Sequence, residues 1–107
     1  MREGKLKVYD ELIAKSERFK RKGKTMPYTS SNGYMFTLFN KEDDIGIRLS
    51  KESQAKFIAD YGSGPYFSHG ATMKDYVKVP EKMLKDLDYL SKYIEESFDF
   101  VNSLPPK

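Results

Sequence analysis

The stretch Gly70-Ala-Thr-Met-Lys-Asp-Tyr-Val-Lys-Val-Pro-Glu-Lys-Met-Leu84 decides the fold of this chain. Residues 76–79 alternate in character, with Tyr76 and Lys78 on one side, which predicts a short strand. Pro80 follows at once, and its fixed φ and missing N–H suit the first turn of a helix. The sequence therefore predicts a strand that passes directly into a helix.

The helix after Pro80 is marked by apolar residues at steps of three and four, and we expect it to run to about Ser103. This apolar stripe consists of Met83, Leu87, Leu90, Tyr93 or Ile94, Phe98 and Val101. Tyr89 and Phe100 lie off the stripe, so a single buried face cannot cover every ring. Because exposed aromatic rings favour association, Tyr89, Tyr93 and Phe100 form a candidate interface for a protein partner or a second copy of the chain.

The rest of the chain alternates between helical and strand patterns. We expect a first helix from Leu6 to about Lys22, capped by Gly23, and then a short strand at Thr25, Met26 and Tyr28. A turn at 30–33 leads to strands at Tyr34–Phe39 and Ile45–Leu49. A second helix at Lys51–Tyr61, between Ser50 and Gly62, is followed by a strand at Tyr66–His69 that pairs with Tyr76–Val79. The order α-β-β-β-α-β-β-α predicts an α+β fold, in which helices pack on an antiparallel sheet.

Composition excludes several classes of protein. The chain has 107 residues, 33% of them charged, and no cysteine, so it has no disulfide framework and no thiolate metal site. The length suits one domain, 1–107 with a core over about 6–102. No apolar run approaches the roughly 20 residues of a membrane span, and residues 1–10 do not resemble a signal peptide. We therefore expect a cytoplasmic protein that makes no membrane contact.

We find no catalytic, metal-binding or cofactor motif, and we expect neither enzymatic activity nor a cofactor. His69 is the single histidine, and we expect it to be a polar surface residue in or beside the turn at Ser68–Gly70. The acidic run Glu42-Asp-Asp44 lacks the spacing of a calcium loop, so a solvated loop is the favoured interpretation.

The segment Lys15–Lys24 carries six basic residues and one acidic residue. Lys20, Arg21, Lys22 and Lys24 are the candidate patch for a nucleic acid or an acidic partner. The favoured alternative is structural, because cations at the end of a helix complement the negative end of its dipole. The strand Asn32–Phe39 also partly matches an RNA-recognition octamer, although core packing explains its rings better.

These residues resemble the N-terminal domain of the TfoX/Sxy family. The matching positions are Met26, Gly33-Tyr34-Met35-Phe36, Ile45 to Leu49, Gly70, Met73, Tyr76, Val79, Pro80 and Leu84. The family usually has Phe-Gly-Gly after its first-strand Met, where this chain has Pro27 to Gly33. The resemblance implies a fold similar to that of type III secretion chaperones and supplies no catalytic residue. A role in competence is not implied, because the full regulator carries a second, helical domain.

We therefore expect a stand-alone TfoX N-terminal-like domain that acts as a non-enzymatic regulatory or protein-interaction module, with a homodimer as its assembly. The alternative is a nucleic-acid-associated regulator that uses the basic segment 15–24.

Overall fold

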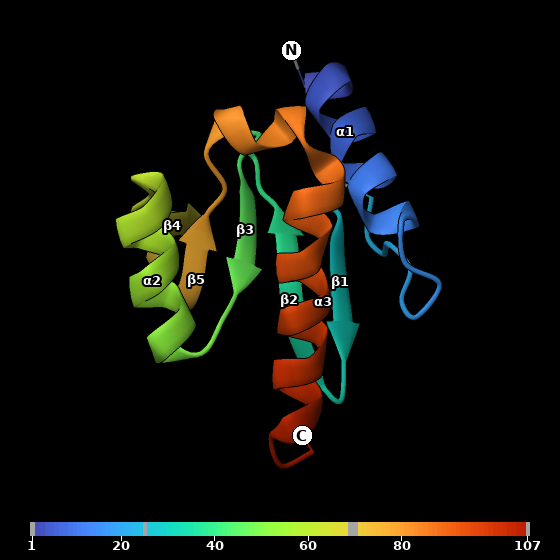
Figure 1. Cartoon of the computed structure of the whole chain (residues 1–107). Helices are drawn as coiled ribbons and strands as arrows, with labels where there is room; N and C mark the ends of the chain where they lie inside the picture. The colour runs from blue at the N-terminus through green and yellow to red at the C-terminus, as the bar shows by residue number, and fades with distance from the viewer. Residues whose placement is uncertain (1, 25, 69–70, 107) are drawn as a thin grey trace.

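The computed structural model describes residues 2–24, 26–68 and 71–106 of the chain (Figure 1). Its elements are α1 (Arg2–Ala14), β1 (Tyr28–Ser31), β2 (Tyr34–Phe39), β3 (Ile45–Arg48), α2 (Lys51–Tyr61), β4 (Pro65–Ser68), β5 (Ala71–Lys78), the 3₁₀ helix η1 (Glu81–Lys85) and α3 (Leu87–Ser103). Within the described residues the strands form one antiparallel sheet in the order β1-β2-β3-β5-β4. The predicted α+β fold and its order of elements are confirmed.

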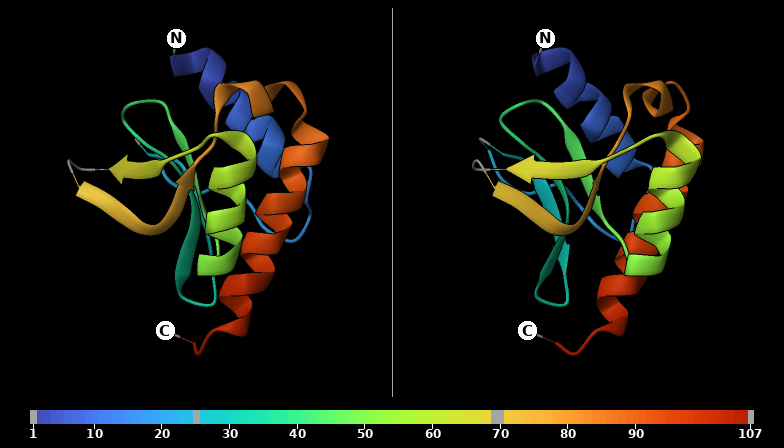
Figure 2. Two further views of the ribbon diagram at one scale, coloured as in Figure 1. Left: turned by 60° about the vertical axis from the view of Figure 1, so that its left-hand side comes forward. Right: turned by 90° about the vertical axis from the view of Figure 1, so that its left-hand side faces the viewer.

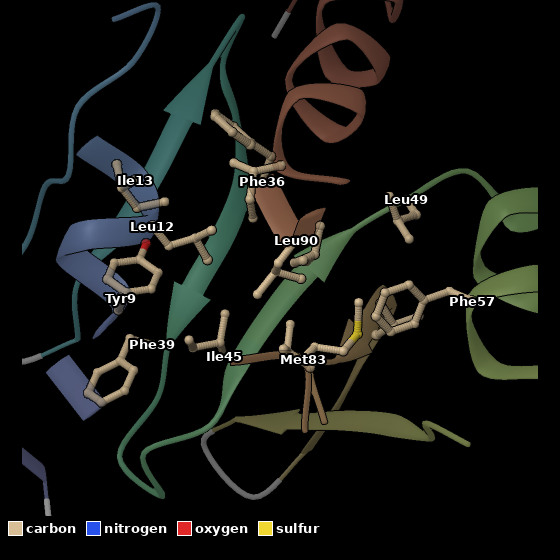
Figure 3. Close-up of a cluster of buried hydrophobic side chains, with 14 of the residues drawn as sticks. Tyr9, Leu12, Ile13, Phe36, Phe39, Ile45, Leu49, Phe57, Met83 and Leu90 are labelled. Atoms are coloured by element: carbon tan, nitrogen blue, oxygen red, sulfur yellow. The ribbon is translucent and has the colours of Figure 1, made fainter. Parts of the chain in front are cut away.

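The three α-helices lie on one face of the sheet, and the main core fills the space between these layers (Figure 2). Tyr9 and Leu12 of α1, Leu90 of α3 and Phe57 of α2 all point into this core (Figure 3). Each of these side chains is at most 1% exposed. Burial of so much apolar surface is the main force that holds the helices on the sheet.

A β-bulge in β2 sets which side chains face the helices. Thr29 pairs with Thr37, whereas Ser30 pairs with Met35, so β2 has one extra residue at Phe36. An extra residue shifts the alternation of a strand, and here Phe36 and Thr37 both face the helices. The Thr37 hydroxyl is fully buried and is satisfied by the Tyr9 hydroxyl at 2.8 Å and by Thr29 Oγ1 at 2.6 Å.

The β4–β5 hairpin bends over the sheet face that the helices leave open (Figure 2). β5 takes a five-residue step from Val77 to Thr72 against a two-residue step in β4. The bend contains Asp75 in the left-handed region at φ 72°, a conformation that aspartate tolerates better than most residues. β5 therefore begins at Ala71, earlier than the strand predicted at Tyr76–Val79.

Tyr66 of β4 is fully buried in a second, smaller apolar cluster between this hairpin and the sheet. Its ring lies directly over Gly46, where a Cβ atom would approach Tyr66 Cε2 to 2.5 Å. The Tyr66 hydroxyl donates toward the carbonyl oxygens of Leu38 at 3.0 Å and Asp44 at 2.9 Å. A strand glycine permits such close approach of a ring, so β3 is covered at Gly46 on the face opposite the helices.

The first helix is shorter than predicted. It ends at Ala14 instead of near Lys22, so Gly23 caps no helix and the cations of 15–24 do not lie on a helix end. The last turn tightens through i→i−3 bonds, from Lys15 N–H to Leu12 and from Ser16 N–H to Ile13. Contacts of the next segment with α3 override the helical pattern, as tertiary contacts often do.

The final helix is interrupted where a continuous helix was predicted. Pro80 precedes η1, and α3 begins only after Asp86, whose side chain accepts a hydrogen bond from the backbone N–H of Tyr89 at 3.1 Å. An aspartate at this position satisfies a free N–H of the new helix and favours a fresh start. Met83 of η1 and Leu90 of α3 are both buried in the main core (Figure 3).

Several local predictions are confirmed. Ser50 Oγ accepts a hydrogen bond from Ser53 N–H at 3.2 Å, and Gly62 ends α2 at φ 65°. The first strand begins at Tyr28, slightly later than expected, and the hairpin turn is Asn32-Gly33. The predictions for Thr25, His69 and Gly70 concern positions outside the described residues. Across the part of the chain that the structure describes, no helix is both long and apolar enough to cross a membrane.

Candidate functional site

A groove runs between α2 and α3, which lie antiparallel on the helical face (Figure 1). Its volume is about 260 Å³. The lining comes from both helices and consists of Ser53, Lys56, Phe57, Tyr89, Lys92, Tyr93 and Glu96. The groove thus has aromatic walls and a rim with charges of both signs.

Phe57 forms the floor of the groove and fixes α2 in place. It is the only described residue of α2 that is buried, at 1% exposed. Its ring centroid lies 5.0 Å from that of Tyr61 and 5.1 Å from that of Tyr93, the latter at an interplanar angle of 88°. Edge-to-face contacts of this kind add to the stabilisation from burial. Aromatic contacts rather than close backbone packing therefore hold α2 beside α3.

Three phenol groups meet at the upper end of the groove. The Tyr61 hydroxyl lies 2.9 Å from the Tyr93 hydroxyl and also contacts the hydroxyl of Tyr89. The Tyr89 side chain is 42% exposed, and the ammonium of Lys92 lies 5.8 Å from its ring centroid. A large ring that is fixed by hydrogen bonds but still exposed is well suited to contact another molecule.

The hydrogen bonds among these phenols shift their pKa values in different directions. Hydrogen bonds from Tyr61 and Tyr93, together with the nearby Lys92 charge, lower the pKa of Tyr89 below its ordinary value. Burial, with hydrogen bonds from its neighbours, raises the pKa of Tyr93. Tyr89 is therefore the phenol of this group that ionises first.

The structure places two of the three predicted interface residues in the groove, Tyr89 and Tyr93. Phe100 follows Tyr93 by seven residues, so it lies on the same side of α3, but it is partly buried against the main core and does not line the groove. The α2 residues were not assigned to the site from the sequence. Their only signal in the sequence is the four-residue spacing of Phe57 and Tyr61, which places both rings on one face of a helix.

The predicted basic patch is divided by the fold. Arg21 donates to both carboxylate oxygens of Asp10, at 2.9 and 3.3 Å, and to the Gly23 carbonyl at 2.7 Å. The hydrogen bond with Asp10 raises the pKa of Arg21. Lys22 Nζ lies 3.3 Å from Ser30 Oγ, while Lys20 and Lys24 are exposed.

Two further cations of segment 15–24 pair with α3. Lys15 Nζ lies 2.6 Å from Asp88 Oδ1, and Arg18 contacts Glu95 at 3.0 Å and also Asp99. Within residues 2–24, 26–68 and 71–106, Lys20, Lys22 and Lys24 are therefore the cations of this segment that make no ion pair. Salt-dependent binding to phosphates scales with the number of available cations, so the folded segment has less capacity for nucleic acid than its composition indicates.

Other sequence candidates are explained by packing. Phe36 and Phe39, two rings of the RNA-recognition octamer match, are fully buried and cannot stack on bases. Asp44 lies 3.6 Å from Lys78 Nζ. Among the described residues there is no cluster of histidine, cysteine and acidic side chains that could hold a metal ion.

No protein-family model matches this chain, and no curated protein matches it significantly. The resemblance to the TfoX/Sxy N-terminal domain therefore rests on the residues that carry it.

Proposed function

We propose that this chain is a cytoplasmic, non-enzymatic protein-interaction module of the TfoX N-terminal type, and that the α2–α3 groove is its binding surface. The observation that carries the proposal is the groove itself, in which the fixed and exposed ring of Tyr89 stands beside Tyr93 over the buried Phe57. Interfaces are enriched in aromatic residues at their centre and have polar rims. The groove has both features.

Comparative affinity capture tests this proposal. The tagged protein and a Tyr89→Ala/Lys92→Ala variant would be used to capture proteins from the native cell, and the captured proteins would be identified by mass spectrometry. Both residues are exposed, so we expect the variant to fold and to lose partners that the wild type retains.

A Lys20→Ala/Lys24→Ala variant is the matched control, since it alters two exposed residues of the basic segment. It should retain the same partners. Loss of partners only in this control, together with binding to DNA or RNA that weakens as salt rises, would contradict the proposal and favour the basic segment.

A further inference from the structure

The rim of the α2–α3 groove carries charges of both signs in a regular arrangement. Lys56 and Asp60 lie four residues apart on α2, and Lys92 and Glu96 lie four residues apart on α3. Lys56, Lys92 and Glu96 line the groove. Asp60 is close enough for its negative charge to disfavour ionisation of the Tyr61 and Tyr89 phenols. All four side chains are exposed.

These charges are not neutralised within the chain. Oppositely charged residues four apart on a helix are positioned to pair, but the order with the cation first is the less favourable one. Among the described residues, none of the four forms an ion pair within 4.0 Å, whereas Lys15, Arg18 and Arg21 all do. The rim charges therefore remain available to another molecule.

The antiparallel helices place these charges at alternating corners. The Phe57–Tyr93 and Tyr61–Tyr89 contacts set the two helices in register. In this register Lys56 and Glu96, and likewise Asp60 and Lys92, are offset by two residues, about 3 Å along the helix axes. A two-fold axis along the groove then brings Lys56 of one copy opposite Glu96 of the other, and Asp60 opposite Lys92. A two-fold interface requires a patch that complements itself in this way.

We propose that the α2–α3 groove binds the same groove of a second copy of this chain, forming a two-fold dimer that buries the exposed Tyr89 rings. The inference rests on the proposed function and specifies its partner. Aromatic rings supply the desolvated contact, and the alternating charges favour two grooves that lie parallel or antiparallel, because a copy turned by a quarter turn places like charges together.

Paired charge reversal tests the inference. One variant carries Lys56→Glu and Lys92→Glu, and the other carries Asp60→Lys and Glu96→Lys. Each should fold, as checked by circular dichroism, and each should self-associate at least about tenfold more weakly than the wild type. An equimolar mixture should restore the dimer, because the two altered patches complement each other. Sedimentation velocity over a micromolar to hundred-micromolar range provides the measurement.

A Lys20→Glu/Lys24→Glu variant has the same change in net charge as Lys56→Glu/Lys92→Glu, but outside the groove, and should dimerise like the wild type. A monomeric wild type over the whole range would overturn the inference, as would full dimerisation of either reversed variant. The wild type could be monomeric while the Tyr89→Ala/Lys92→Ala variant still fails to capture a partner that the wild type captures. That result would contradict self-association and leave the proposed function intact.

Discussion

On the side of α3 that faces the segment after α1, charged side chains form ion pairs with that segment. On the side that faces α2, the charges make no ion pair among the described residues, and the ring of Tyr89 is exposed. Arg18 illustrates the first side. Its guanidinium contacts Glu95 and Asp99 and lies 4.3 Å from the ring centroid of Phe98. On the α2 side, Lys92 and Glu96 make no ion pair with any residue that the structure describes, and Tyr89 is exposed.

This difference changes the interpretation of the charge distribution in the sequence. From the sequence alone, the basic segment 15–24 is a candidate patch for a nucleic acid or an acidic partner. The structure shows that the Lys15 and Arg18 cations meet the α3 carboxylates within the same chain. The surface that remains for a partner is therefore marked by rings and mixed charges rather than by an excess of one sign.

Removing Phe57, which holds α2 on the sheet, should have the largest effect on stability. Phe57→Ala should lower the free energy of unfolding by about 3–5 kcal/mol, because it deletes the one buried side chain among the described residues of α2 and leaves a cavity. Urea unfolding measures the loss, and hydrogen exchange should show that α2 amides lose protection while α1 amides keep it.

Ile58→Ala is the matched control for Phe57→Ala. Ile58 neighbours Phe57 on the same helix but is 38% exposed, so its truncation should change stability by less than about 1 kcal/mol. Equal losses for the two variants would contradict an anchoring role for Phe57.

Raising the pH should distinguish the buried phenols of the chain from the exposed phenol of the groove, because their pKa values are shifted in opposite directions. Burial raises the pKa of Tyr9 of α1 and raises the pKa of Tyr76 of β5 to about 12, whereas hydrogen bonds lower the pKa of Tyr89. A phenol with a raised folded pKa holds a proton that the unfolded chain releases. The stability from Tyr76 is thus fully present below about pH 10 and is lost toward pH 12, a change of about 2–3 kcal/mol.

Two measurements check this pH dependence. Urea unfolding at about pH 8 and about pH 11 should show the loss of stability, and unchanged stability would refute the assignment. Phenolate absorbance should show an early ionisation phase in the wild type that disappears in Tyr89→Phe.

The smallest expected effect concerns the paired side of α3. Arg18→Met keeps an apolar stem over Phe98 but removes the contacts with Glu95 and Asp99, so we expect a loss of about 0.5–1 kcal/mol, as for exposed ion pairs. The difference from wild type should shrink in about 1 M salt, which screens these charges. Lys20→Met, at an exposed position without an ion pair, should change stability little at either salt concentration.

The sequence was most informative where the decisive contact is local. Ser50 and Gly62 bound α2 as predicted, since a cap depends on neighbouring backbone groups and on a left-handed glycine. The end of α1 could not be predicted in the same way. Phe19 fits a continued helical stripe, but its ring packs 5.1 Å from Phe36 and 5.2 Å from Phe98, and such long-range contacts are invisible in the local pattern.

In the candidate site too, the locally determined features could be predicted from the sequence, whereas those that depend on long-range contacts could not. Tyr89 was recognised as lying off the buried stripe because helical periodicity is a local property. The groove also needs Phe57 and Tyr61, which lie about 30 residues away in sequence and meet α3 only in the folded chain. Asp86 is a residue type that favours the start of a helix, so the sequence contains a local sign of the interruption. The apolar pattern continues across it, however, and predicts one uninterrupted helix.

The seating of Tyr66 on Gly46 has a consequence for tracing the ancestry of this fold. A ring at 66 requires a bare backbone at 46, and a bare backbone at 46 leaves a void unless a ring fills it. In homologous sequences the two positions should therefore be substituted together, an aromatic with glycine or a smaller residue with a larger one. Such paired substitution would mark distant relatives whose overall identity has faded.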